Sequence, residues 1–229
     1  MAIKSYIICL SKIESSYESG CRLKEELENF NMQAELFEGS YGNIKAKEYA
    51  NENRLPHEWG IKGPKKPYPW EYRKTMIRPG LIGCFDSHYR LWQKCVEVDK
   101  PIIIFEDDAH VIRPFYKVEW EDVLSLVSSH RKKMAKYIDY LENPEGPYKA
   151  MNYRQGSMPG NAGYAIKPHA AKILVDEYAK SFLPADNAIN QHLVKIQIHN
   201  YMMGKAVSRA KTSGKPSLIR TKYWDKLDD

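Results

Sequence analysis

Three consecutive carboxylates, Glu106, Asp107 and Asp108, directly follow the apolar run 102–105. The run is Ile-Ile-Ile-Phe, which is short and β-branched and predicts a buried strand. The carboxylates would then lie at the edge where open α/β sheets bind ligands. Adjacent anions repel one another, so a divalent cation would compensate their charge, and carboxylate oxygens suit Mg²⁺ or Mn²⁺. Such a cation could neutralise a nucleotide diphosphate as the leaving group of a transfer reaction. The alternative is a solvated acidic turn that caps the next segment.

The segments around these carboxylates predict an α/β fold. Residues 6–10 and 34–37 are apolar, strand-like runs, and residues 22–29 between them have helical spacing. A strand–helix–strand opening favours a parallel sheet with flanking helices. A glycine-bearing turn follows the second strand. Further helices are expected over residues 81–98, 119–134 and 169–178 and from 184 to 195, with an apolar run at 164–166.

Length and composition limit the class of protein. The chain has 229 residues, of which 43% are hydrophobic and 28% charged, as is ordinary for a single globular domain over residues 1–229. A disordered, collagen-like or disulfide-scaffold protein is excluded. No apolar run reaches the roughly 20 residues that span a bilayer, and the N-terminus lacks the pattern of a signal peptide. We therefore expect a cytoplasmic protein without membrane insertion, and we make no prediction of its oligomeric state.

The cysteines indicate neither a zinc site nor a redox motif. They are Cys9, Cys21, Cys84 and Cys95, and no two of them form a C-x-x-C pair. Three of the four lie in apolar, strand-like or helix-like runs. Buried, reduced thiols are therefore expected.

The charge is unevenly distributed along the chain. The formal net charge is +6, but residues 1–60 hold seven basic and ten acidic side chains, so the excess of positive charge lies after them. Two basic segments stand out: a loop at 55–80 with five prolines and three glycines, and a C-terminal segment at 203–229. Long ordered loops in compact domains are usually functional. Cations interleaved with aromatic rings suit a polyanion such as nucleic acid, whereas the alternative is a solvated surface that helps to hold a diphosphate.

Several ordered blocks together carry a resemblance that no single motif would. They are Gly80-Leu-Ile-Gly-Cys-Phe-Asp-Ser-His-Tyr-Arg-Leu-Trp92, Ile103-Ile-Phe-Glu-Asp-Asp-Ala109, Asn161-Ala-Gly-Tyr-Ala-Ile166 and Pro184-Ala-Asp186. In order and spacing the chain resembles glycosyltransferase family 25 from Tyr6 to about Ile219. The resemblance implies a GT-A-like α/β fold with a mostly parallel open sheet flanked by helices. It also implies a nucleotide-sugar donor and inversion at the anomeric carbon.

The resemblance also implies roles for single residues. Glu106 and Asp108 match the metal-binding Asp-x-Asp element, and His199 would be a late histidine ligand to Mn²⁺ or Mg²⁺. Asp186 would be the general base that deprotonates the acceptor hydroxyl, with a helix N-cap as its alternative. For Ser87 and His88 the alternative is helix packing. The donor-binding candidates are Leu10, Ser11, Lys12, Glu38, Gly39, Ser87, His88, Asp107, Asn161 and Gly163. The stretch Ile-Cys-Leu-Ser at 8–11 departs from the family's Ile-Asn-Leu block, which weakens the assignment there.

Two acceptors fit the resemblance. The chain looks similar to members of T-even-type bacteriophages that glycosylate hydroxymethylcytosine in DNA, which would place it in the host cytoplasm. A base in a duplex must be flipped out, which favours a long basic and aromatic loop. The acceptor-binding candidates are Lys65, Lys66, Tyr68, Trp70, Tyr72 and Arg73. The alternative acceptor is a lipooligosaccharide, and the second alternative is a catalytically inactive DNA-binding protein.

Overall fold

A seven-stranded sheet organises the computed structural model, which describes residues 3–59, 63–111, 113–126, 150–152, 156–158 and 160–199. The strand order is β2-β1-β4-β7-β5-β9-β6. The pairings make five of the seven strands run in one direction, while β7 and β6 run in the other. The strands are β1 (Lys4–Cys9), β2 (Ala34–Glu38), β4 (Ile102–Glu106), β5 (Val123–Ser125), β6 (Ala150–Asn152), β7 (Gly163–Ile166) and β9 (Ile196–His199).

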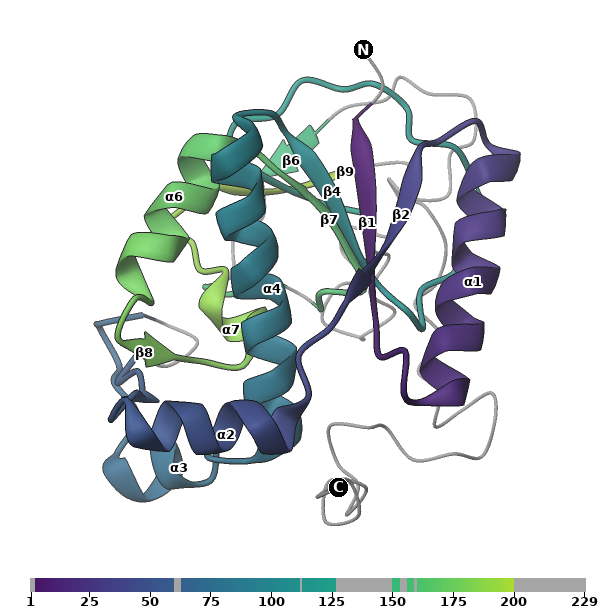
Figure 1. Ribbon diagram of the computed structural model, residues 1–229. Helices are drawn as coiled ribbons and strands as arrows, with labels where there is room; N and C mark the ends of the chain where they lie inside the picture. Colours follow the sequence, from purple (N-terminus) through teal and green to yellow (C-terminus); the bar gives the residue numbers. More distant parts are fainter. Residues whose placement is uncertain are drawn as a thin grey trace.

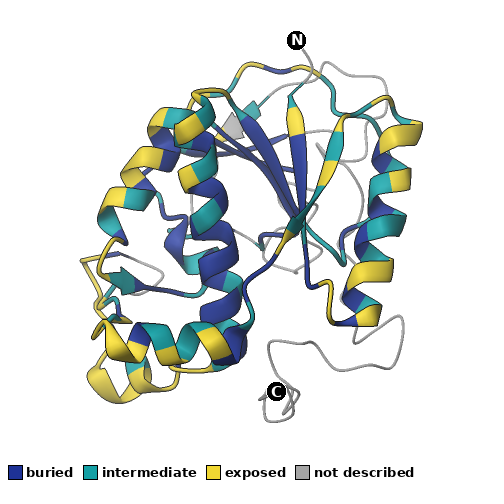
Figure 2. Cartoon of the chain, in the orientation of Figure 1, coloured by how far each residue is buried: buried dark blue, intermediate teal, exposed yellow. Residues whose placement is uncertain are grey.

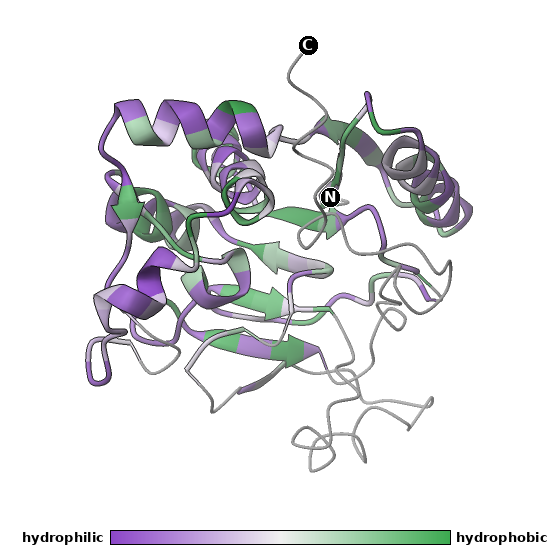
Figure 3. Cartoon of the chain, turned by 90° about the horizontal axis from the view of Figure 1, so that it is seen from below, coloured by the Kyte–Doolittle hydropathy of each residue, from purple (hydrophilic) through white to green (hydrophobic). Residues whose placement is uncertain are grey.

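Helices cover both faces of this sheet (Figure 1). One face carries α1 (Glu14–Asn29), and the other carries α4 (Pro79–Val98) and α6 (Pro168–Glu177). The helices turn buried residues inward and exposed residues outward (Figure 2). Because both faces are covered, β4 is apolar and buried from Ile102 to Phe105 rather than alternating. The strands are accordingly the most hydrophobic elements in the view onto the lower edge (Figure 3).

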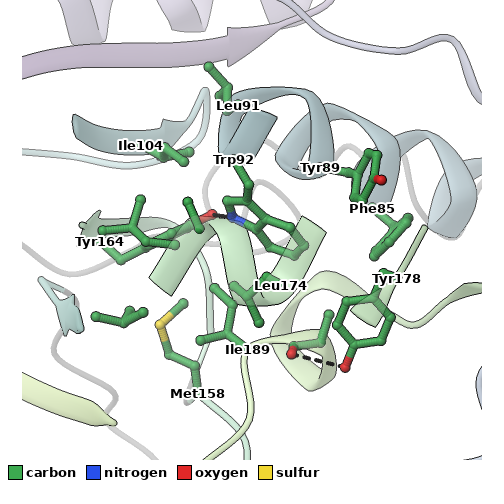
Figure 4. Packing of buried hydrophobic residues seen from close by; sticks show 14 of the residues in the cluster. Phe85, Tyr89, Leu91, Trp92, Ile104, Met158, Tyr164, Leu174, Tyr178 and Ile189 are labelled. Carbon is green, nitrogen blue, oxygen red and sulfur yellow. Dashed lines mark hydrogen bonds between the residues drawn. The ribbon is translucent and has the colours of Figure 1, made fainter. Parts of the chain in front are cut away.

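The larger part of the core lies between α4 and the sheet. Phe85 and Trp92 of α4 are fully buried, as are Tyr164 of β7 and Tyr178 after α6 (Figure 4). The ring of Phe85 meets those of Trp92 and Tyr178 edge-on, at 6.0 and 5.8 Å between centroids. Full burial of each large apolar side chain contributes about 1.5–3 kcal/mol, so α4 is the element that the core holds most firmly.

The remaining elements lie beside α4 and at its lower end in Figure 1. They are the helices α2 (Gly42–Asn51), α3 (Trp70–Lys74) and α7 (Ala185–Ala188), and the paired strands β3 (Leu55–Pro56) and β8 (Ser181–Phe182). These elements lie near the carboxyl ends of the central strands (Figure 1). Segments from two distant parts of the sequence, 42–74 and 181–188, therefore meet at one edge of the sheet.

The predicted fold class is confirmed, as are most of the predicted elements. The strands expected at 6–10, 34–37 and 102–105 and the helices at 81–98 and 169–178 are present with slightly different bounds. The helix expected at 22–29 begins earlier, at Glu14. The structure contains no helix long and apolar enough to cross a membrane in the parts of the chain that it describes.

Two predictions of helix are wrong in the described residues. Residues 123–125, placed in a helix over 119–134, form β5, because they are fully buried between β7 and β9 and pair with both. The segment from 184 to 195 is helical only over α7, since Asn190 forms a bridge with Ser157. The loop at 55–80 contains β3 and α3, and α2 was not expected. Residues 127–134 and the basic segment at 203–229 lie outside the described residues.

Candidate active site

Glu106 ends β4 at the carboxyl edge of the sheet, against the side of α4. His88 Nε2 lies 3.4 Å from Glu106 Oε1, and the Cys84 thiol donates to the same oxygen at 3.9 Å. The His88 side chain is 1% exposed, whereas that of Glu106 is 29% exposed. One side of the carboxylate is thus held by the protein, and the other side is accessible to a ligand.

Two further carboxylates lie near this point. Burial, followed by the negative charges of Glu106, Asp186 and Asp108, raises the pKa of the Cys84 thiol well above its usual value. The charges of Asp108, from the turn after β4, and of Asp186, from α7, thus act on the same thiol that contacts Glu106. Asp186 and Cys84 are far apart in the sequence but come near each other because α7 packs against α4.

Asp186 is not a helix N-cap. The N-cap position of α7 is Pro184, and Asp186 lies in the first turn of the helix. That alternative interpretation of Asp186 is therefore wrong. Asp186 is half-buried, and its charge acts on Cys84, which contacts Glu106. This position suits a general base, and the role itself remains a prediction.

Asp107 contacts the opposite side of the sheet from Glu106. The hydroxyl of Ser16, in α1, donates to Asp107 Oδ2 and accepts from the backbone N–H of Leu10 at 2.9 Å. Arg22 donates to the backbone carbonyl of Asp107 at 3.3 Å. The side chains of Glu106 and Asp107 thus lie on opposite faces of the sheet. Through Ser16, Asp107 is linked to the loop that follows β1.

The loops after β1 and β2 form one unit beside Asp107. The N–H of Ser11 donates to Glu38 Oε1 at 3.2 Å, and that of Gly39 donates to the carbonyl of Cys9 at 2.7 Å. A Cβ at Gly39 would lie 3.1 Å from Ile8 Cγ2 and 3.2 Å from the Cys9 carbonyl oxygen. The structure therefore brings together the predicted donor residues at the ends of these two strands, which are Leu10, Ser11, Lys12, Glu38 and Gly39.

Buried polar groups fasten the second of these loops to α4, and sequence reasoning missed two of them. Asp86 accepts from the hydroxyls of Ser40 at 2.5 Å and Tyr49 at 2.8 Å. Ser87 accepts from the N–H of Ser40 at 2.8 Å and donates to the carbonyl of Gly83 at 2.7 Å. The described contacts of Ser87 are thus those of helix packing, and they hold the donor loop in place. A carboxylate in an apolar helical stripe was the signal that could have revealed Asp86.

Family comparison agrees with this geometry. Residues 2–189 match the model of "Glycosyltransferase family 25 (LPS biosynthesis protein)". The chain belongs to this family. It is also 30% identical over 124 residues to a "Glycosyltransferase 25 family member" of Drosophila pseudoobscura pseudoobscura. That alignment covers 53% of this chain and 18% of the relative, so the chain spans a minor part of the relative's length.

Two of the remaining site residues expected of a family 25 member, Asn161 and Gly163, lie close to Glu106, and a third, His199, does not. Asn161 and Gly163 lie beside the end of β4, where Gly163 pairs with Phe105. Asn161 is buried, and its Oδ1 atom has no hydrogen-bond partner among the described residues. These two residues thus lie next to Glu106, and their role in binding the donor remains a prediction.

His199 is separated from Glu106. It ends β9, three places from β4 in the sheet and level with Phe105, or about 14 Å away at the usual strand spacing. Its ring contacts Phe115 and the carbonyl of Tyr116, and burial lowers its pKa. The geometry therefore does not bring His199 to the carboxylate that it was expected to join.

The predicted acceptor residues of this family 25 chain lie mostly at the surface. Lys65, Lys66, Trp70 and Tyr72 are exposed, and the ring of half-buried Tyr68 lies 4.5 Å from that of Tyr72. Of seven exposed large hydrophobic side chains in the described parts of the chain, five fall between residues 44 and 77.

Arg73 differs from the other acceptor candidates. Its guanidinium donates to the carbonyl of Pro56 at 2.7 and 3.1 Å, and it lies 5.1 Å from the centre of the Trp70 ring. The described contacts of Arg73 therefore join α3 to β3 and place its guanidinium against the ring of the exposed Trp70.

Proposed function

We propose that this chain transfers a sugar from a nucleotide-sugar donor to an acceptor hydroxyl, with inversion at the anomeric carbon. The observation that carries the proposal is that Glu106 contacts Cys84, that the charges of Asp108 and Asp186 act on the same thiol, and that the loops after β1 and β2 are joined to each other. Membership of family 25 supports the same activity. In α/β sheets of this kind, ligands bind outside the carboxyl ends of the strands, where all of these residues lie.

The chemistry of the side chains fits a hard divalent cation. Glu106 and Asp108 offer the carboxylate oxygens that Mg²⁺ and Mn²⁺ prefer. Burial and the neighbouring carboxylates raise the pKa of the Cys84 thiol, which donates a hydrogen bond to Glu106. A cation held by Glu106 and Asp108 would neutralise the charge that grows on the leaving diphosphate.

Asp186 would act on the acceptor. As the acceptor oxygen forms its bond to the anomeric carbon, the bond from that carbon to the diphosphate breaks, and Asp186 takes the hydroxyl proton. The loops at 10–12 and 38–39 would hold the nucleotide, because their backbones are fixed by each other and by Asp86 and Ser87. Rigid loops of this kind orient a donor without further ordering.

Exposed rings and lysines between residues 65 and 72 support an acceptor-binding role for the surface around α3. Hydroxymethylcytosine in DNA suits it, because cations contact phosphates and rings stack on bases. A lipopolysaccharide-type saccharide is the second acceptor, and the description of the matched family favours it.

Binding of manganese and nucleoside diphosphates tests the donor site directly. By isothermal titration, we expect the wild-type chain to bind one nucleoside diphosphate in a manganese-dependent way. Asp108→Asn should weaken this binding at least about 10-fold, because one hard ligand is lost. Asp99→Asn is the matched control, since Asp99 lies at the far end of α4 and asparagine tolerates its φ of 46°. Absence of binding by the wild type, or equal binding by Asp108→Asn, would favour an inactive DNA-binding protein.

A further inference from the structure

A buried chain of hydrogen bonds runs from the core to Glu106. The indole Nε1 of Trp92 lies 2.9 Å from the hydroxyl of Tyr164, and that hydroxyl lies 2.9 Å from His88 Nδ1. The other ring nitrogen, Nε2, faces Glu106 Oε1 at 3.4 Å. Trp92, Tyr164 and His88 are all fully buried. Figure 4 shows the first link, with the indole nitrogen directed at the Tyr164 oxygen.

The chemistry of the first member sets the direction of the chain. An indole N–H can only donate, so the Tyr164 oxygen accepts from Trp92. The hydroxyl proton of Tyr164 then needs its own acceptor, and His88 Nδ1 is its partner among the described contacts. A neutral imidazole that accepts at Nδ1 carries its proton at Nε2. That proton points to the carboxylate of Glu106, which can only accept when ionised.

From this we infer that His88 is a positioning residue for Glu106, held in the Nε2–H tautomer by Tyr164 and Trp92. Together with the Cys84 thiol it presents two donors to one carboxylate oxygen. Glu106 is thereby fixed in one orientation, although its side chain is partly exposed. Groups behind a ligand commonly set its orientation in this way.

The opposite tautomer would suit a different site. The ligand atoms of Cys84, His88 and Glu106 lie within 4.8 Å of one another, close enough to surround a metal ion. Coordination through His88 Nε2 would move its proton to Nδ1, so the Tyr164 oxygen would receive two donors and its own proton would lose its described acceptor. A buried hydroxyl left without an acceptor is destabilising, which favours the donor role of Nε2 over metal binding.

The tautomer can be measured without any ligand. In protein labelled with ¹⁵N-histidine and freed of metal, the ¹⁵N shifts of the two ring nitrogens report which one carries the proton. The chain has seven histidines, and the His88 signals are those missing from His88→Gln. We expect the proton at Nε2 in the wild type. A proton on Nδ1, in the neutral ring or the imidazolium, would overturn the inference, as would a shift of Nε2 on adding zinc alone.

Two variants separate positioning from packing. Tyr164→Phe keeps the ring but removes the link, so His88 should lose its single tautomer and manganese-dependent nucleotide binding should weaken about 10-fold. Tyr178→Phe is the control, because it removes an equally buried hydroxyl that donates to the carbonyl of Ala188 instead. Equal spectra and affinities for the two variants would show that the hydrogen bonds from Trp92 to His88 serve packing alone and do not position Glu106.

Replacement of His88 itself gives a rescue test. His88→Gln can still place an amide N–H toward Glu106, so it should retain nucleotide binding within about 3-fold, whereas His88→Leu should lose about 10-fold. Equal losses in the two variants would contradict the positioning role. The effect on Glu106 rests on the proposed function, but the tautomer does not: the expected tautomer in a chain that binds no nucleotide would refute only the function.

Discussion

Asp186 is the residue whose role depends most on the arrangement of the site. It lies half-buried in the first turn of α7, and its charge acts on Cys84 together with those of Glu106 and Asp108. Asp186→Asn should lower turnover at least about 100-fold, because the amide cannot take the acceptor proton. Donor affinity by titration should stay within about 2-fold of the wild type, since a proton-transfer role leaves donor binding alone.

Asp176→Asn provides the control for this prediction. Asp176 lies on the exposed side of α6, paired with Lys172 at 2.8 Å, and an exposed ion pair contributes little. Turnover of that variant should match the wild type. Near-normal turnover of Asp186→Asn, or loss of donor binding in it, would remove Asp186 as the base.

At the residue scale, the part of the site that could be predicted is the part with a local pattern. The acidic triplet after an apolar strand is such a pattern, and it led to Glu106 and Asp108. The contact between Asp86 and Ser40 has no local pattern, because it joins residues that are 46 positions apart. His199 was expected because the resemblance implies a late histidine ligand, and the order of the strands separates it from Glu106.

At the scale of elements, the crossing of α2 and α4 controls the donor loop. A Cβ at Gly83 would lie 2.6 Å from the carbonyl oxygen of Ser40 and 2.9 Å from the Cα of Gly42. These are backbone atoms that cannot turn aside, so Gly83→Ala should destabilise the protein by about 1–3 kcal/mol. The expected fall in the melting temperature is about 2 to 12 °C for a chain of this size. Gln93→Ala, at an exposed position of the same helix, should leave that temperature within about 2 °C.

The same crossing links stability to function. Ser40 is held by Asp86 and Ser87, and it adjoins the loop residue Gly39. If Gly83→Ala moves this loop, nucleoside diphosphate affinity should fall together with stability. A variant with wild-type melting temperature and affinity would show that the two helices can separate without cost, contrary to the close backbone contact.

Elements with a strong local pattern were predicted well. Short strands whose formation depends on the strands beside them were not. The stripe of Phe85, Leu91 and Trp92 indicated α4 because all three bury the same helix face. Residues 123–125 form a strand only because β7 and β9 lie on either side of them, and no local pattern reports such neighbours. For the same reason β9 itself was not expected.

At the scale of the whole molecule, the donor site and the exposed aromatic surface lie on neighbouring elements. Helix α2, which packs on α4, connects the loop after β2 with the segment that contains α3 (Figure 1). Donor and acceptor surfaces can therefore be changed separately. The surface around α3 joins Trp70, 39% exposed, with the cations of Arg73 and Lys74 at 5.1 and 5.8 Å from its ring.

Trp70→Ala should weaken use of the acceptor and leave the donor alone. If the indole stacks on a base, the loss is about 1–3 kcal/mol, or roughly 5- to 150-fold in acceptor KM. Tyr17→Ala is the control, since Tyr17 is an exposed aromatic residue on α1, on the other face of the sheet.

Transfer is measured in parallel with hydroxymethylated duplex DNA and with a lipooligosaccharide core, at about 50 and about 200 mM salt. A DNA acceptor requires binding that falls steeply over this range, because phosphate contacts release counterions, whereas binding of an uncharged saccharide changes little. Reduced nucleotide affinity with an unchanged acceptor KM would instead assign this surface to the donor.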